Sequence, residues 1–339
     1  MTGFSISAGW CILYGFSGLL TLSVSRPGKH LDLWKGLYKY MKRAVSISIG
    51  SSKRDKAVEV ELLGEKISIE RIGTDGDMEK AAQLYGELDG KVDAFGVGGA
   101  DLGLMVDNRW YPLYSVLPMV RLVKQTPVVD GAGLKNTLEL KVAAVLDEKL
   151  GGYIEPRHVF LTAGADRWGM TCSFFDAGYE CVFGDLMFGL GLPIPIRSIQ
   201  GIKILASLLL PILGRLPFKW LYPIGEKQEH RVPKFQKYYQ WARVVAGDCH
   251  YVKRHMPDRL DGKVIVTNTT TPADVELFRQ AGVKYLMTTT PSLDGRSFGT
   301  NVMEAALVAV AGKNRKLTNV ELEEMLAQLN LVPQLQELK

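Results

Sequence analysis

The sequence predicts an α/β protein in which an N-terminal α/β domain precedes a doubly wound parallel sheet. From residue 44 onward, short apolar strand-like runs alternate with helix-like segments. Residues 157–192 give the clearest example, with a strand, a glycine turn, a helix and a second strand. Three more strand-like runs, 244–246, 264–267 and 285–287, are separated by helical segments. Such alternation is typical of parallel strands that are connected by helices.

The glycine turn in residues 157–192 has the spacing of a nucleotide-binding turn. An apolar run ends at Leu161, the turn runs from Gly164 to Gly169, and a second apolar run stops before Asp185. In such a turn the first glycine allows the tight bend and the last lets helix and strand pack closely. The helix start then presents free N–H groups and a positive dipole end to an anion.

Asp185 lies where a carboxylate would accept hydrogen bonds from a ribose 2′-hydroxyl, which favours NAD over NADP. Asp166 replaces the middle glycine, and its carboxylate would repel phosphate unless it turns away or pairs with Arg167. The candidate cofactor-binding residues of this turn are therefore Gly164, Asp166, Arg167, Gly169 and Asp185. The alternative is an ordinary strand–helix–strand unit whose glycines serve only the turn.

Composition indicates a globular chain large enough for two domains. The 339 residues are 47% hydrophobic and 23% charged, with a net charge of +5. Basic and acidic residues are interleaved, so nucleic acid is not expected as a partner, whereas an anionic small molecule is. The four cysteines show no metal-ligand spacing, which predicts no metal site and reduced thiols in the cytoplasm.

Residues 1–40 differ from the rest of the chain. They contain an apolar stretch, 3–24, that is followed rather than preceded by basic residues, which argues against a secretory signal. We expect translation to start at Met41 and the preceding residues to be a poorly structured extension. The alternative is a single N-terminal membrane anchor.

We expect an α/β substrate domain over residues 41–152 and a Rossmann-like dinucleotide-binding domain over 153–313, followed by a C-terminal helix in 314–339. The elements predicted in the first domain are a strand at 44–49, a hairpin of 58–63 and 67–72, a helix at 77–88, a strand at 92–97, a hairpin around Asp107, a helix at 114–124, a strand at 127–129 and a helix at 138–150.

The second domain is expected to carry a helical insertion at about 190–240. Residues 199–213 are apolar on nearly every side but too short to span a bilayer. They form either a helix buried between the domains or an apolar wall for a greasy substrate or a membrane surface. Helices at 274–281 and 301–310 should complete the parallel sheet. Thr318 and Glu321 predict a capping box at the start of a final helix, 319–329.

Small and polar residues follow nearly every predicted strand, and ligands of parallel sheets bind at the carboxyl ends of strands. Thr267, Asn268 and Thr269 are candidates for contacts with the nicotinamide half of a dinucleotide; the alternative is that they are strand ends and helix caps. The candidate substrate-binding residues follow two strands of the first domain. They are Asp101, Asn136 and Thr137.

The candidates for acid–base catalysis are Lys135, Asp130, Lys227 and His250. A lysine in a closed cleft can exchange a proton with an alcohol as hydride leaves the carbon, since desolvation lowers the lysine pKa toward neutrality. Lys135 has Asp130 nearby in the sequence. The alternatives are a solvated lysine at a helix start and a capping or structural histidine.

Several segments together resemble bacterial proteins of the quinate/shikimate 5-dehydrogenase-like family. They are GADRWG at 164–169, GDLMFGLGLP at 184–193, LYPIGEKQ at 221–228, TNTTTP at 267–272 and GRSFGTNVMEAA at 295–306. The resemblance covers residues 41 to about 313 and implies a substrate domain, a dinucleotide domain, and hydride transfer assisted by a lysine and an aspartate. The family's N-V-T-x-P-x-K segment and its middle glycine are not found.

The function predicted is therefore an NAD(P)-dependent oxidoreductase that acts on a hydroxylated anionic small molecule. One alternative is a lipid or acyl-thioester reductase that uses the apolar insertion, with Cys249 as a nucleophile. Another is a nucleotide-binding regulator without catalysis. A membrane surface is a less favoured partner than a small molecule, and association into a homo-oligomer is left open.

Overall fold

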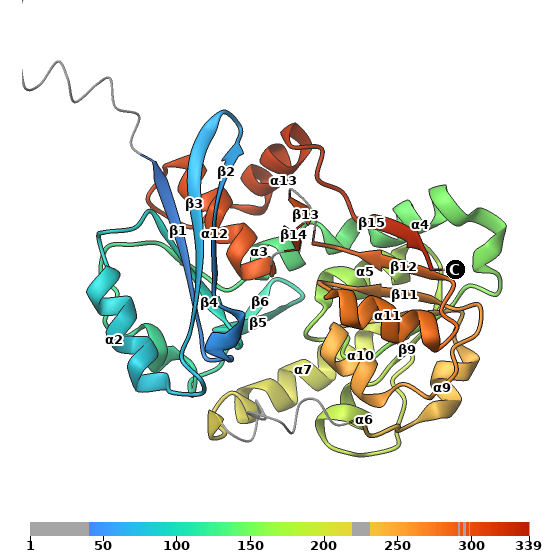
Figure 1. Ribbon diagram of the computed structural model, residues 1–339. Coiled ribbons are helices and arrows are strands. Elements are labelled where there is room, and N and C mark those ends of the chain that lie inside the picture. The colour runs from blue at the N-terminus through green and yellow to red at the C-terminus, as the bar shows by residue number, and fades with distance from the viewer. Residues whose placement is uncertain (1–40, 219–230, 291, 294–295, 298, 339) are drawn as a thin grey trace, which may run out of the picture. The chain divides into compact units, whose positions relative to one another are not determined.

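The computed structural model describes residues 41–218, 231–290, 292–293, 296–297 and 299–338. The expectations for residues 1–40 and for Lys227 lie outside the described residues. The described chain contains two main sheets (Figure 1). Within it, we find no helix with both the length and the apolar character needed to cross a bilayer.

The first sheet has the strand order β2-β3-β1-β4-β7, in which β2 pairs antiparallel to β3 and the other neighbours are parallel. Its strands are β1 Lys42–Ser48, β2 Lys56–Leu62, β3 Glu65–Gly73, β4 Ala94–Gly98 and β7 Val128–Val129. A separate hairpin is formed by β5 Gly103–Val106 and β6 Arg109–Pro112. Both predicted hairpins are confirmed. Their turns place Leu63, Gly64, Asp107 and Asn108 at positive φ, which favours Gly, Asn and Asp.

The helical segments of residues 41–154 are η1 Ser52–Arg54, α2 Met78–Leu88, η2 Leu117–Val120, α3 Ala132–Lys135, η3 Glu139–Lys141, α4 Val142–Leu150 and η4 Gly151–Ile154. Alternating residues of the first sheet face two cores. Val45 and Phe95 pack with Tyr85 of α2, whereas Ala44 and Ala94 pack on the opposite face.

The helix predicted at 114–124 is wrong, because only the short 3-10 helix η2 forms there. Pro118 lies inside this segment. A proline lacks an N–H donor and disfavours the α conformation of the residue before it, so a continuous helix is interrupted.

The second sheet has the order β15-β12-β11-β10-β8-β9, parallel throughout except for the edge strand β15. Its strands are β8 His158–Leu161, β9 Glu180–Phe183, β10 Val244–Ala246, β11 Val264–Thr267, β12 Tyr285–Thr288 and β15 Gln334–Glu337, and a small hairpin pairs β13 Ser292–Leu293 with β14 Arg296–Ser297. The chain order reverses between β8 and β10. This is the topological switch point, where open parallel sheets bind ligands. The predicted fold class is confirmed.

Helices cover both faces of the second sheet. One core joins it to α4, α5 and α7, and the other joins it to α9, α10 and α11. The helices of this part are α5 Trp168–Asp176, α6 Asp185–Gly189, α7 Ile199–Leu213, α9 Gln236–Trp241, α10 Cys249–His255, α11 Pro272–Gln280, α12 Thr300–Ala311 and α13 Asn319–Gln328.

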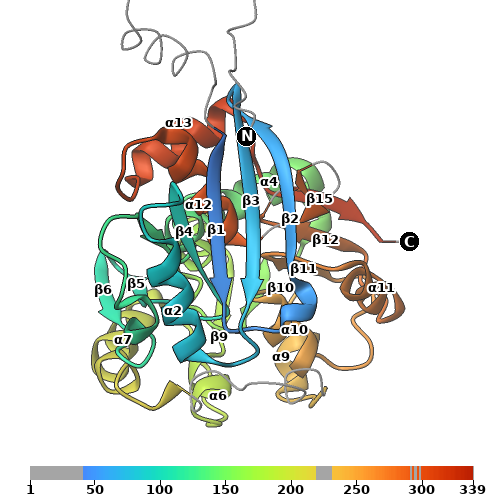
Figure 2. The same ribbon diagram turned by 60° about the vertical axis from the view of Figure 1, so that its left-hand side comes forward.

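Helix α12 corrects one expectation. The sequence predicts that residues 301–310 complete the second sheet, but α12 packs on the first sheet together with α13 (Figure 2). Its nearly all-apolar surface is buried against Ala44, Ile67 and Ala94. The chain thus returns to the first sheet before β15 joins the second. The capping box of Thr318 and Glu321 at the start of α13 is confirmed.

Candidate functional site

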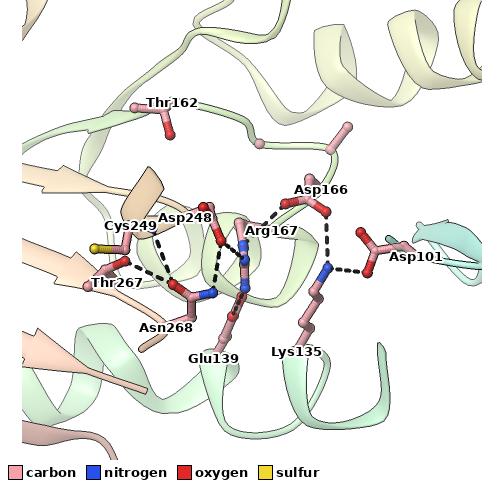
Figure 3. A network of polar contacts seen from close by, with 12 residues as sticks. Asp101, Lys135, Glu139, Thr162, Asp166, Arg167, Asp248, Cys249, Thr267 and Asn268 are labelled. Carbon is pink, nitrogen blue, oxygen red and sulfur yellow. Dashed lines mark hydrogen bonds and ion pairs between the residues drawn. The ribbon is translucent and has the colours of Figure 1, made fainter. Parts of the chain in front are cut away.

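The ends of strands from both sheets meet in one network of ion pairs (Figure 3). Lys135, the last residue of α3, lies between two carboxylates. Its Nζ atom donates to Asp101 Oδ1 at 2.8 Å and to Asp166 Oδ1 at 3.1 Å. Asp101 follows β4 of the first sheet, and Asp166 lies in the glycine turn after β8 of the second. Lys135 therefore joins the carboxyl-terminal edges of the two sheets.

Helix α3 holds Lys135 in place through its own first turn. Gly131 begins the helix at φ 94°, a conformation that favours glycine. The backbone N–H groups of Gly133 and Leu134 donate to Glu304 Oε2 at 2.9 and 3.3 Å. A carboxylate at this point satisfies helix-start donors that would otherwise lack partners. Glu304, on α12, thus anchors the helix that carries Lys135.

The electrostatics of Lys135 correct one expectation. Burial lowers the pKa of its ammonium, but Asp101 and Asp166 together outweigh burial, so the pKa is raised above its ordinary value. Lys135 is thus a permanent cation at neutral pH rather than a lysine tuned to titrate there. The carboxyl group of Asp101 has the tuned pKa: burial raises it to about 6 although Lys135 opposes the rise.

Arg167 is a second buried cation, with 4% of its side chain exposed, and lies among three carboxylates. Its Nη1 donates to Glu139 Oε1 at 2.8 Å and its Nη2 to Asp248 Oδ2 at 2.9 Å. The Nε atom lies 3.2 Å from Asp166 Oδ2. Asp166 is therefore shared by Arg167 and Lys135, as its place in the turn requires if it is not to repel an anion.

The two glycines of the turn allow close packing, as the sequence predicts. A Cβ at Gly164 would lie 2.8 Å from Phe183 Cδ1, and one at Gly169 would lie 2.1 Å from the Lys135 carbonyl oxygen. Gly169 thus lets α5 start directly against α3. A branched side chain at position 164 would disturb the packing on β9 before it affected any ligand.

Asp185 lies beside this turn. Its Oδ2 and Oδ1 accept hydrogen bonds from the N–H groups of Gly164 and Ala165, each at 2.8 Å. Burial raises the pKa of its carboxyl group to about 6 despite these bonds. A carboxylate has about four acceptor positions, so Asp185 keeps capacity for further donors.

These residues fit part of a dinucleotide. Gly164 gives the tight turn, and Asp185 follows the next strand, the position of the ribose-binding acid in this fingerprint, although here its carboxylate accepts from the turn itself. The departure is Asp166, where the fingerprint has a glycine. Because Lys135 and Arg167 both pair with Asp166, its negative charge is offset. An anion beside the turn would therefore meet a carboxylate whose charge two cations offset.

The candidates at the end of β11 are connected to Arg167 through a series of hydrogen bonds between side chains. Asn268 donates through Nδ2 to Asp248 Oδ2 at 2.8 Å. Its Oδ1 accepts from the Cys249 N–H at 3.2 Å and from the Thr267 hydroxyl at 3.1 Å. The Thr269 hydroxyl donates to the Thr290 hydroxyl at 3.3 Å. Asn268 and Thr267 thus orient Asp248.

Other candidates have structural partners. Asp130 accepts from the N–H groups of Leu102 and Ala132, which ties β7 to the loop after β4. Thr137 corrects the substrate-binding expectation: it is fully buried and its hydroxyl donates to the Gly133 carbonyl oxygen at 2.9 Å.

Three more candidates take part in hydrogen bonds through their backbone N–H groups. The Asn136 backbone N–H closes the last turn of α3. His250 is exposed on α10, and its backbone N–H donates to Asp248 Oδ1. Burial raises the pKa of the Cys249 thiol well above its ordinary value, so Cys249 is a poor nucleophile.

Three residues of the site, Glu139, Asp248 and Glu304, are not among the candidates that the sequence predicts. Glu139 has no exposed surface, although it lies in a segment predicted as helix. Asp248 lies two residues after β10, so its place near a strand end was visible in the sequence. Glu304 lies 171 positions from Gly133, and no local pattern points to that contact.

Family comparisons divide the chain close to Lys135. The family described as "Domain of unknown function (DUF8754)" matches residues 133–338. The chain belongs to this family. A second family, "Domain of unknown function (DUF8753)", matches residues 43–130. Asp101 falls in the DUF8753 match, and Lys135 and Asp166 fall in the DUF8754 match. The ion pair of Lys135 with Asp101 therefore crosses from one family segment to the other, whereas its pair with Asp166 stays within the DUF8754 segment.

Solved structures similar to this DUF8754 chain include malic enzymes. The NAD-dependent malic enzyme of Thermotoga maritima is 14% identical over 91% of this chain and 87% of that chain, with a TM-score of 0.37. The malic enzyme of Entamoeba histolytica is 12% identical over 86% and 62%, with a TM-score of 0.38. TM-scores below 0.5 do not establish a shared fold, and no function follows from them. No curated protein matches the chain. None of these findings names a quinate or shikimate dehydrogenase.

Glu304 gives a prediction about stability and pH. Burial, with a smaller contribution from Asp130, raises the pKa of its carboxyl group to about 7. Between the unfolded pKa of 4.5 and that value, the native state binds more protons than the unfolded state, so stability falls as pH rises through this window. For the native protein this decline in the free energy of unfolding is on the order of 3 kcal/mol. We expect Glu304→Gln, which keeps an acceptor oxygen for Gly133, to remove it.

Urea unfolding of both proteins at pH 5 and pH 8 measures this effect. The unfolding free energy of Glu304→Gln, relative to that of the native protein, should be higher at pH 8 than at pH 5. Parallel pH curves would show that the Glu304 carboxyl group does not titrate in this window.

Proposed function

We propose that this protein is an NAD(P)-dependent oxidoreductase acting on a hydroxylated anionic small molecule, with its reaction centre at Lys135 and Asp101. The observation that carries the proposal is the position of Lys135. A buried ammonium is held between a carboxylate from the first sheet and one from the glycine turn, at the switch point of a parallel sheet.

The pair divides the proton chemistry of an alcohol oxidation between its members. A bound nicotinamide cofactor would accept the hydride from the alcohol carbon. The hydroxyl proton needs a base, and Asp101, whose pKa is raised to about 6, is ionised at neutral pH yet basic enough to accept it. Lys135 remains an ammonium and stabilises negative charge on the substrate oxygen.

The glycine turn is the proposed cofactor site. Asp185 would receive ribose hydroxyl groups, Gly164 would allow the chain to approach the cofactor, and Lys135 and Arg167 would offset the charge of Asp166. Asn268 would act indirectly, since it holds Asp248 against Arg167.

Two arginines, Arg54 of η1 and Arg71 of β3, lie beside the loop that follows β1 and favour an anionic substrate. The guanidinium groups of Arg54 and Arg71 both approach Gly50, at 2.6 and 3.1 Å from the position of a Cβ there. Burial and the nearby Arg54 lower the pKa of Arg71. β1 pairs directly with β4, which leads to Asp101. Arg71 Nη1 already donates to Asp55 Oδ1 at 2.8 Å, and a carboxylate or phosphate of the substrate would give these guanidinium groups a further acceptor.

Fluorescence titration with NADH and NADPH tests the cofactor site. We expect Asp185→Asn to weaken NADH binding by about tenfold, because ribose hydroxyls lose a charged acceptor, and to weaken NADPH binding less. Circular dichroism should show that the variant is folded. A native protein that binds neither cofactor would refute the proposal, and one that prefers NADPH would refute the role of Asp185.

A screen of hydroxylated carboxylates and phosphates with NAD⁺ or NADP⁺, read as absorbance of the reduced cofactor, tests the reaction itself. The proposal requires turnover of at least one anionic alcohol by the native protein and its loss in a Lys135 variant.

A further inference from the structure

Helix α7 is apolar on two opposite sides. Ile202, Ala206 and Leu210 are buried in the core of the second sheet. A second row, offset by two positions and therefore by about 200° around the helix, faces outward. Its members Ile204, Leu208 and Ile212 are 51%, 64% and 62% exposed. The sequence predicts either a buried helix or an apolar wall, and α7 has one face of each kind.

The segment before α7 also exposes apolar side chains. Leu190, Leu192 and Ile194 follow α6 and are each more than two-fifths exposed. Both ribbon views place α6 and α7 below the two sheets (Figures 1 and 2). Large exposed apolar patches mark sites of association with a protein or a membrane.

The charge of this region favours an anionic partner. Residues 186–218 contain no aspartate or glutamate and three cations, Arg197, Lys203 and Arg215. Arg197 and Lys203 pair with Glu180 and Asp107 from other parts of the chain. Such exposed ion pairs contribute little free energy, so these cations can exchange a carboxylate for a lipid phosphate.

We propose that the outer face of α7 docks on an anionic lipid bilayer. Ile204, Leu208 and Ile212 enter the boundary between headgroups and acyl chains, and the cations contact lipid phosphates. The helix lies in the plane of the interface, as amphipathic helices with flanking cations do. Its 15 residues do not span a bilayer.

A second copy of the chain fits this face less well. A symmetric dimer through α7 would bring the same surface of both copies together. Arg197, Lys203 and Arg215 of both copies would then share one interface, and residues 186–218 bring no acidic side chain to pair with the cations of the other copy. An anionic bilayer would bury the apolar row and also pair with the cations.

Vesicle co-sedimentation of the full chain tests the proposal. The probes are vesicles of phosphatidylcholine alone and vesicles that also contain about 30 mol% of the anionic lipid phosphatidylglycerol. We expect binding to the anionic vesicles that weakens as salt is raised. The triple variant Ile204→Ser, Leu208→Ser, Ile212→Ser should lower the partition coefficient by roughly 100-fold, because three exposed apolar side chains no longer enter the bilayer.

The matched control replaces exposed valines on another part of the surface. Val320→Ser, 64% exposed on α13, combined with Val332→Ser, 45% exposed, should leave binding unchanged. Equal binding of the triple variant would overturn the proposal and move the membrane contact elsewhere, including residues 1–40. No preference for anionic vesicles would also overturn it. A dimer in analytical ultracentrifugation that the triple variant abolishes, without vesicle binding, would assign the face to a second copy.

Discussion

Replacing Lys135 by methionine is expected to lower turnover by roughly 10²–10⁴-fold, the range typical of groups that handle protons or charge at a reaction centre. Methionine keeps the apolar volume of the stem but removes the ammonium. Asp101 and Asp166 then lose the cation that they share, and Asp101 loses the group that opposes the rise of its pKa. The measurement is steady-state kinetics on the substrate found in the screen, as a function of pH.

The pH profile separates a chemical role from a structural one. If Asp101 accepts the proton, the acidic limb of kcat/KM lies near pH 6 in the native protein and moves upward in Lys135→Met. Lys135→Arg keeps the charge and is the matched control. Near-normal turnover in Lys135→Met would exclude Lys135 from the reaction. Loss of NADH binding together with turnover would show instead that Lys135 maintains the cofactor turn through Asp166.

The elements of the fold follow mostly from local patterns. The hairpin of β2 and β3 was predictable from alternating residues around a turn that favours glycine, and the cap at Thr318 from spacing alone. The placement of α12 was not predictable in this way. Its residues are apolar on nearly all sides, so their pattern gives burial but not the sheet that buries them.

The candidate site divides in the same manner. Lys135, Asp166 and Asp101 were found because they follow strands whose ends meet at one edge. Their pairing was not predictable. Without it, the sequence predicts a lowered pKa for Lys135, whereas the two ion pairs raise it. Local sequence gives the desolvation of a lysine, but the opposing charges come from residues 34 and 31 positions away. Glu304 was missed for the same reason.

Replacing Arg167 by methionine is expected to reduce the free energy of unfolding by about 3–5 kcal/mol, the usual effect of removing one partner from a buried ion pair. Arg167 is the cation that contacts Glu139, Asp166 and Asp248, and Glu139 has no exposed surface. Burial already raises the pKa of Glu139 although Arg167 opposes the rise. Without Arg167 a buried negative charge would lack its compensation.

The loss should depend on pH in a direction that identifies this cause. In Arg167→Met the pKa of Glu139 rises further, so the native state takes up a proton that the unfolded state releases, and stability falls as pH rises. Urea unfolding should therefore give a smaller deficit at pH 5 than at pH 8. Arg167→Lys, which keeps a positive charge near Glu139, should lose less at both. A deficit below about 1 kcal/mol that does not change with pH would mean that water or local rearrangement compensates Glu139, and the two sheets would not depend on Arg167 for their connection.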